Sequence, residues 1–279
     1  MILSSLTTEA LCNFKSNIVL NAGNKFIDLE HMEVLKQEFF KDKDVGIEYR
    51  EKECLIAIQG PNSAKLLQPY LSEDLNKLQF KDFCMMKVKP LGCDIDIYRT
   101  GYTGEDGFEI SIHSDHLESF TRMLFEETDL APAGLGARDL LRLEAGLCLH
   151  GHEMNTSISP VESLLQWTIR KENHFCDFYG YEALQEIKLK KTKQKRVGLR
   201  LKEGGVPREG CELFDSEGKK VGKLTSGAFS GDLKTGIGMG YVRRKFGNQG
   251  TELFIDIRGR KKKCEIVKMP FIPHKYFKA

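Results

Sequence analysis

The chain has 279 residues and a formal net charge of +2, which suits one large domain or two to three small ones and gives no charge-based sign of a nucleic-acid partner. Its eight cysteines include no Cys-x-x-Cys pair, so reduced, buried thiols are favoured over a disulfide framework or a zinc site. No apolar run approaches the ~20 residues needed to cross a bilayer.

The first half of the chain predicts helices layered on a mixed sheet, which is an α+β arrangement. Apolar periodicity predicts a strand over Ile18–Gly23 and a helix over Lys25–Lys41. The elements predicted after these are a strand within Ile47–Gln59, a helix beginning at Gly60, a hairpin of strands Met85–Val88 and Cys93–Tyr98, a strand from Phe108 and a helix over Asp115–Glu127.

A glycine-rich stretch from Arg99 to Ser111 opens as a turn and closes as a strand. Its three glycines allow positive φ or close approach to a ligand, and three carboxylates lie beside them. Glu109 projects from the strand just after the turn, where a carboxylate can grip a guanidine-like group with two hydrogen bonds. A solvated hairpin turn explains the same pattern, so the residues alone leave a binding site and a plain turn equally open.

A helix is predicted over Ala137–Leu147, because this segment is rich in good helix formers. Arg138, Arg142 and Glu144 lie at roughly helical spacing, so an Arg–Glu pair on this helix is one possibility. A structural helix with surface charges is the other.

The basic run 188–196 predicts a domain boundary, and short strands separated by glycine-rich turns follow it. Their spacing is typical of a small antiparallel barrel or sandwich. The predicted strands are Val197–Leu201, Cys211–Phe214, Lys219–Thr225, Gly236–Val242, Glu252–Ile257 and Lys262–Lys268.

Two other patterns suggest ligands only weakly. His150 and His152 lack the carboxylates or cysteines that a metal site needs nearby, so no metal is expected. The basic runs 188–196 and 258–263 could bind RNA, but they lack the interleaved aromatic residues that stack on bases. Solvated linkers or strand edges, or contact with an acidic protein partner, are the other interpretations.

Five motifs, taken in order, resemble the aminomethyltransferase (T-protein) family of the glycine cleavage system from about Asn17 to Tyr276. The resemblance implies a folate-binding α+β cloverleaf, built from incomplete ferredoxin-like α/β domains and a C-terminal antiparallel β-barrel. The expected parts are a remnant of an N-terminal domain (1–45), a central folate-binding domain (46–187) and the barrel domain (188–279). The motifs are Gly101–Glu109, Gly134–Asp139, Leu141–Leu147, Ser159–Glu162 with Trp167, and Lys268–Phe271.

The family's reaction is what this resemblance implies for the function. The methylene of an aminomethyl group on the lipoyl arm of H-protein passes to the co-substrate tetrahydrofolate, and ammonia is released. The implied setting is the mitochondrial matrix, with lipoylated H-protein as the partner, a monomeric enzyme, and no metal, nucleic acid or membrane involved.

The resemblance also assigns site residues. Glu109 would bind the pterin, whose edge presents two donors in a row, and Arg138 would hold the pterin or orient Glu109. Arg196 matches a position near the folate tail and the entrance for the lipoyl arm. Matching positions that line the channel or lie near the site are Val19, Tyr102, Trp167 and Tyr276.

The chain departs from the family pattern at its N-terminus. Family members extend further in that direction, so the sequence is expected to be N-terminally incomplete. The segment Met1–Asn17 has Lys15 as its single basic residue, so it is not expected to act as an organelle transit peptide. Ungapped alignment puts Ser5 at the position of the catalytic aspartate, which supports the positive charge developing on the substrate. A neutral serine cannot do this, so a catalytically impaired relative that binds folate or H-protein is the alternative.

Overall fold

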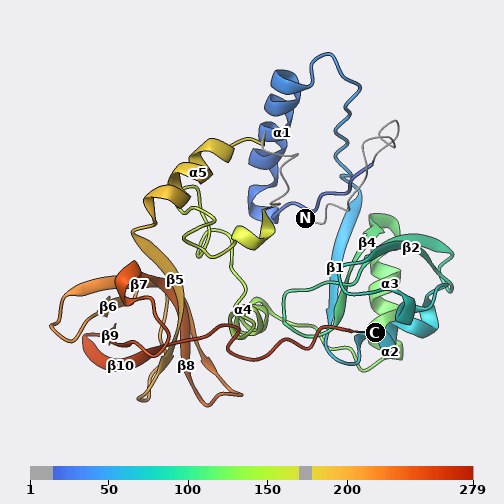
Figure 1. Ribbon diagram of the computed structural model, residues 1–279. Coiled ribbons are helices and arrows are strands. Elements are labelled where there is room, and N and C mark those ends of the chain that lie inside the picture. The colour runs from blue at the N-terminus through green and yellow to red at the C-terminus, as the bar shows by residue number, and fades with distance from the viewer. Residues whose placement is uncertain (1–14, 170–177, 279) are drawn as a thin grey trace.

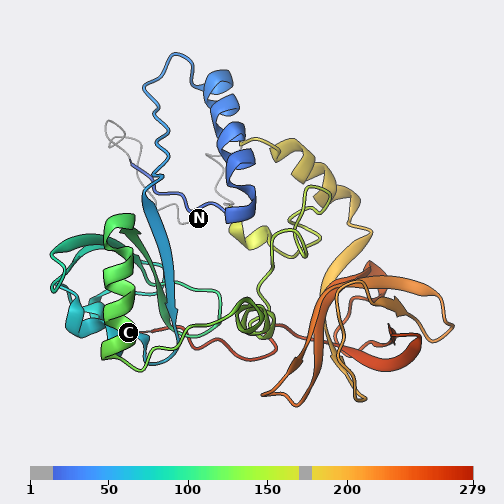
Figure 2. The same ribbon diagram turned by 180° about the vertical axis from the view of Figure 1, so that it is seen from behind.

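The computed structural model describes residues 15–169 and 178–278. A four-stranded sheet and a closed barrel lie on opposite sides of helix α4 (Leu135–Glu144) (Figures 1 and 2). Helices α1 (Lys25–Phe39) and α5 (Tyr181–Lys190) lie above them in both views. Helix α1 confirms the prediction for Lys25–Lys41, whereas α5 was not predicted.

The sheet has the strand order β1-β4-β3-β2, and every neighbouring pair is antiparallel. The prediction of a mixed sheet is therefore wrong, although its four strands are where the sequence indicates. Helix α3 (Ser114–Glu127) packs on β1 and β4 and contributes Phe120 and Leu124 to the core. The sheet elements are β1 (Glu53–Gln59), the short helix α2 (Ser63–Leu67), β2 (Phe83–Val88), β3 (Cys93–Tyr98) and β4 (Gly107–His113).

The strand predicted over Ile18–Gly23 does not form. Residues 15–21 have no regular structure, and a 3-10 turn over Ala22–Asn24 leads into α1. A strand needs a hydrogen-bonded neighbour, and the sheet ends at β1, which pairs only with β4 in the described part of the chain.

Helix α1 leaves several of its apolar side chains in solvent. None of its residues is buried, and Phe26 and Ile27 are 70% and 63% exposed. Across the described residues, the helices are too short or too polar to cross a membrane.

The C-terminal part is a closed antiparallel barrel, which confirms one of the two predicted architectures. Closure gives every strand two neighbours and removes exposed sheet edges. A bulge in β7 at Thr225 shifts the register against β8 and turns this part of the strand toward α4. The strands, in the order β10-β5-β8-β7-β6-β9, are β5 (Gln194–Leu201), β6 (Glu212–Phe214), β7 (Lys220–Ser230), β8 (Thr235–Arg243), β9 (Glu252–Ile257) and β10 (Arg260–Val267).

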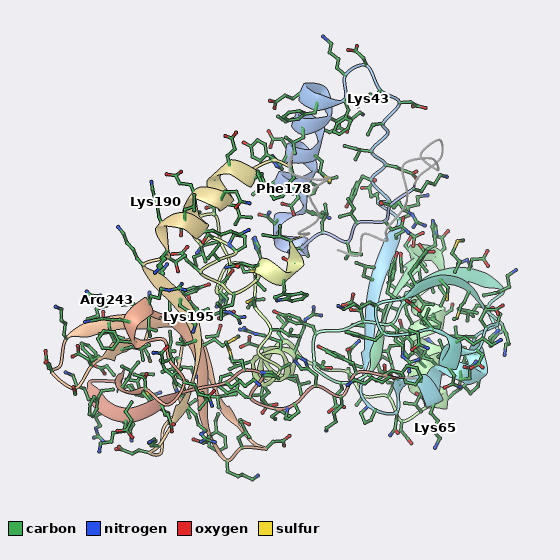
Figure 3. The ribbon with its side chains drawn as sticks, in the orientation of Figure 1. Lys43, Lys65, Phe178, Lys190, Lys195 and Arg243 are labelled. Carbon is green, nitrogen blue, oxygen red and sulfur yellow. The ribbon has the colours of Figure 1, made fainter. Side chains whose placement is uncertain are left out.

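The basic run 188–196 spans the end of one element, a three-residue link (191–193) and the start of the next. Lys188 and Lys190 lie in the last turn of α5, where positive charge stabilises the helix dipole, and β5 begins at Gln194. Figure 3 shows Lys190 on α5, with Lys195 and Arg243 at the adjoining end of the barrel. The domain boundary between residues 187 and 188 therefore lies within α5, and we retain the three-part division only as a proposal.

The C-terminal tail (residues 268–278) runs from the barrel across the end of α4 to the sheet (Figure 1). The Phe271 amide donates to the Glu144 carbonyl oxygen at 2.9 Å, and the Lys275 amide donates to the Gly104 carbonyl oxygen at 2.7 Å. The Phe277 ring covers the Arg99 guanidinium, whose Cζ lies 3.5 Å from the ring centre. The tail therefore ties the barrel to the loop between β3 and β4.

Candidate functional site

The glycine turn (residues 99–107) is fixed by a buried arginine. Arg99 donates to both carboxylate oxygens of Asp106 at 2.9 and 2.6 Å, and to the carbonyl oxygens of Leu75 and Leu78 at 2.7 and 2.9 Å. Its side chain is 1% exposed. Such a two-pronged charge-assisted pair fixes the turn before any ligand binds.

The glycines serve close packing inside the protein. A Cβ on Gly101 would lie 1.7 Å from Gln59 Oε1, and one on Gly107 would lie 2.7 Å from Gln59 Cδ. Gly104 has a φ of +79°, which disfavours other residues. The sequence suggested positive φ or close approach to a ligand at these glycines. Gly104 has the positive φ, and at Gly101 and Gly107 the backbone approaches the side chain of Gln59. The Gln59 amide in turn donates to the Thr100 and Phe108 carbonyl oxygens.

Gly101→Ala is expected to lower the free energy of unfolding by about 1–3 kcal/mol, because the new methyl group displaces Gln59 from its hydrogen bonds. Urea denaturation measures the loss. Gly46→Ala is the control, since a Cβ there meets nothing within 4 Å and should change stability by less than about 0.5 kcal/mol. If the steric reason is right, Gln59→Ala combined with Gly101→Ala costs less than the sum of the two single changes.

The three carboxylates of the stretch have different surroundings. Asp106 pairs with Arg99, and Glu105 pairs with Lys275 of the tail at 2.9 Å. Glu109 makes no hydrogen bond or ion pair with a side chain of the described residues, although it is only partly exposed. Burial raises the pKa of the Glu109 carboxyl, and the nearby positive charge of Arg138 acts in the opposite direction. Glu109 is therefore the carboxylate of this stretch with oxygens available to a ligand.

A cavity of about 360 Å³ brings Glu109 together with two other predicted site residues, Tyr102 and Arg138. The Arg138 guanidinium lies against the Tyr102 ring, with Cζ 5.4 Å from the ring centre. The Tyr102 hydroxyl donates to the Cys148 carbonyl oxygen, and burial raises the pKa of Tyr102 to about 12. The other walls are mostly apolar and include Ile56, Ile58, Leu124, Phe125 and Leu130.

A second cavity, of about 530 Å³, contains Arg196 and Trp167. The Arg196 guanidinium is held by the carbonyl oxygens of Ser163 and Gly146 at 2.8 and 3.1 Å, while Trp167 is 70% exposed. Tyr102 lines the first cavity and Cys148 lines the second, so the hydrogen bond between them links the walls of the two cavities. Further basic or polar residues around the second cavity are Lys195, Lys268, Gln249 and His274.

The remaining predicted site residues lie outside both cavities. Val19 is 52% exposed, and the Tyr276 ring stacks on Phe80 with the ring centres 4.0 Å apart. Ser5 lies outside the described residues. Within the described ranges, no cluster of three histidine, cysteine or acidic residues could hold a metal ion.

Sequence reasoning missed Tyr98, which is paired with Glu109 across β3 and β4. Its hydroxyl accepts a hydrogen bond from the Asn17 side chain at 3.2 Å, so residue 17 comes close to the strand that carries Glu109. Only the register between β3 and β4 shows that Tyr98 lies opposite Glu109, and the sequence alone does not give this register.

Comparison with known proteins accounts for both halves of this architecture. A family profile described as the GCVT N-terminal domain matches residues 1–173, and one described as the glycine cleavage T-protein C-terminal barrel domain matches residues 194–272. The chain belongs to the glycine cleavage T-protein family. This membership confirms the resemblance and the expected fold class.

Named relatives agree with this family. Mitochondrial aminomethyltransferases are 40% identical over 265 residues in Pisum sativum and 37% identical over 263 residues in Mus musculus. The crystal structure of the glycine cleavage system aminomethyltransferase T from Bartonella henselae matches with a TM-score of 0.81 and 35% identity, covering 92% of this chain and 69% of that one. The matches cover 94% and 93% of this chain but only 64% of each curated relative, so the chain spans about two thirds of their length.

Proposed function

We propose that this chain acts in the T-protein reaction of glycine catabolism and one-carbon metabolism. Tetrahydrofolate takes the methylene from the aminomethyl group on the lipoyl arm of H-protein, forming 5,10-methylenetetrahydrofolate. Ammonia and the reduced lipoyl arm are the other products. The observation that carries the proposal is the Glu109 carboxylate, which has no side-chain partner among the described residues and lines one cavity with Arg138 and Tyr102 in a T-protein family member.

The first cavity fits the pterin end of the folate. A pterin edge presents two neighbouring N–H donors, and an ionised carboxylate is an acceptor-only group with two oxygens. Glu109 can therefore accept both hydrogen bonds. The positive charge of Arg138 favours the ionised carboxylate and the Tyr102 ring offers a flat aromatic surface, while the apolar walls exclude water from the bound ring.

The second cavity suits the anionic tail of the same ligand. Lys195, Arg196 and Lys268 give it positive charge, and exposed Trp167 offers a flat surface beside them. Because a hydrogen bond between Tyr102 and Cys148 links the walls of the two cavities, we propose that one elongated molecule occupies both. We assign Arg196 to this end of the ligand and propose that the lipoyl arm enters here.

The partner and the compartment follow from the relatives. Their names place aminomethyltransferases of this family in mitochondria, so we propose the mitochondrial matrix, with lipoylated H-protein as the partner. A monomeric state stays a prediction.

Two measurements on the full chain test the function. Calorimetric titration with tetrahydrofolate asks whether the site binds its co-substrate, and ammonia release from aminomethyl-loaded H-protein asks whether the methylene is transferred. Absence of tetrahydrofolate binding would contradict the proposal. Binding without ammonia release would instead identify a catalytically impaired relative.

Binding should weaken as the pH falls, and earlier than for an ordinary glutamate. Burial raises the pKa of Glu109, so its ionised form is fully present only above this raised pKa and is lost as the pH falls through it. Calorimetric titrations between about pH 5 and pH 8 should therefore show falling affinity toward the acid end. Glu109→Gln removes the titrating group and should flatten this part of the profile; an unchanged profile would exclude Glu109 as its origin.

A further inference from the structure

A buried ion pair joins α4 to the barrel. Arg142 of α4 donates through Nη1 to Glu153 Oε2 at 2.8 Å, and the two side chains are 1% and 0% exposed. Nη2 donates to Ser226 Oγ of β7 at 2.8 Å, and Nε donates to Asp139 Oδ1 at 2.7 Å. The spacing suggested an Arg–Glu pair within the helix. The acidic partner of Arg142 on α4 is instead Asp139, and its other side-chain partners, Glu153 and Ser226, lie in a loop and in the barrel.

Glu153 is anchored on its other side by the barrel. Its Oε1 accepts hydrogen bonds from the hydroxyls of Thr225 and Ser226 at 2.6 and 2.5 Å, and the Tyr241 hydroxyl donates to its carbonyl oxygen at 2.6 Å. Its Oε2 also accepts the Leu149 amide at 2.9 Å. The bulge in β7 falls at Thr225, so the irregularity in the strand presents both hydroxyls to this carboxylate.

The Arg142–Glu153 pair is connected to two residues of the first cavity, Arg138 and Tyr102, through α4 and through the backbone around Cys148. Arg138 precedes Arg142 by one helical turn on α4, in the exposed half of that helix. The Tyr102 hydroxyl donates to the carbonyl oxygen of Cys148, and that residue lies between two backbone groups that Arg142 and Glu153 hold. The Arg142–Glu153 pair therefore holds both the helix that carries Arg138 and the backbone to which Tyr102 is hydrogen-bonded.

A buried ion pair as a whole contributes little net stability relative to apolar side chains, so a positional role explains it better. We propose that the Arg142–Glu153–Ser226 cluster is a positioning device, which aligns Arg138 and Tyr102 with the ligand-binding carboxylate by fastening α4 and the following loop to the barrel. This proposal rests on the proposed function for its ligand. None of the three residues lines either cavity.

Ser226→Ala loosens the cluster without leaving a charge unpaired, because Arg142 keeps Glu153 and Asp139 as partners. Ser230→Ala is a matched control. Ser230 lies on the same strand and loses a hydrogen bond of 2.6 Å to Glu144 at the end of the same helix. Ser226→Ala removes the hydrogen bonds of its hydroxyl to Arg142 and Glu153. Both variants should lower the melting temperature, but only Ser226→Ala should weaken tetrahydrofolate binding, by about threefold to tenfold, which is the size of effect that one hydrogen bond typically has. Equal weakening in both variants would overturn the proposal.

A double-mutant cycle separates positioning from general loosening. If Ser226 acts through Arg138, Ser226→Ala should have little further effect on tetrahydrofolate affinity in an Arg138→Ala background. Additive effects would mean that Ser226 does not act through Arg138, and would overturn the assignment.

A ligand-free readout keeps this test independent of the proposed function. The Tyr102 ring signal, assigned among the eight tyrosines by Tyr102→Phe in a 13C-tyrosine-labelled chain, reports the contact with Arg138 directly. It should shift in Ser226→Ala and stay in place in Ser230→Ala. An unmoved signal in Ser226→Ala overturns the positioning role, whereas failure of the parent chain to bind tetrahydrofolate counts against the proposed function alone.

Discussion

Glu153→Ala is expected to lower the free energy of unfolding by about 3–5 kcal/mol, because it leaves the positive charge of Arg142 buried without its main partner. The change also removes the acceptor of the Thr225 and Ser226 hydroxyls. Urea denaturation, followed by circular dichroism, measures the loss.

Two comparisons show whether the buried charge is the cause. Glu209→Ala removes a 62% exposed carboxylate that lies 3.5 Å from His152, and should change stability by less than about 1 kcal/mol. Replacing the whole pair, with Arg142→Met and Glu153→Leu together, should destabilise the chain less than Glu153→Ala does, because no charge is then left alone. A double variant at least as unstable as the single one would contradict this explanation.

Glu109→Ala is expected to weaken tetrahydrofolate binding by roughly tenfold to a hundredfold, which corresponds to about 1.5–3 kcal/mol for hydrogen bonds to a charged group. The fold should be little affected, because Glu109 makes no hydrogen bond to another described side chain. Calorimetric titration of the parent and the variant provides the comparison.

The neighbouring carboxylate supplies the control for this effect. Glu105 belongs to the same stretch, but it pairs with Lys275 at the surface. Glu105→Ala should therefore leave tetrahydrofolate affinity within about twofold, since exposed ion pairs contribute little. If both variants lost affinity equally, the loss would reflect damage to the turn, and the assignment of Glu109 to the ligand would fail.

Local patterns in the sequence were enough to locate most elements of the fold. The barrel strands and helices α1 and α3 form where periodicity and turn residues indicate them. The strand predicted over Ile18–Gly23 failed because β-structure depends on a neighbour that the pattern cannot supply. For the same reason, the antiparallel sense of the whole sheet could not be derived from its separate strands.

The candidate site was predictable only where its residues belong to recognisable motifs. Glu109, Tyr102 and Arg138, which the resemblance singles out, line one cavity, although nothing in the local pattern brings β4 and α4 together. Their roles toward a ligand stay predictions. Gln59 and Glu153 escaped notice because their partners lie far away in the sequence or outside helical spacing. Both residues act through contacts with distant parts of the chain, and a single sequence does not show which distant residues will pack together.

The C-terminal tail has a consequence for synthesis of the protein. Lys275 meets Glu105, which precedes it by 170 residues, and at roughly 5–20 residues per second this separation takes roughly 10–30 s to translate. During that time the C-terminal tail does not yet cover the glycine turn, and the Phe277 ring does not yet cover the Arg99 guanidinium. The sheet and most of the barrel can fold during this interval, so the tail covers a turn that Arg99 and Asp106 have already fixed.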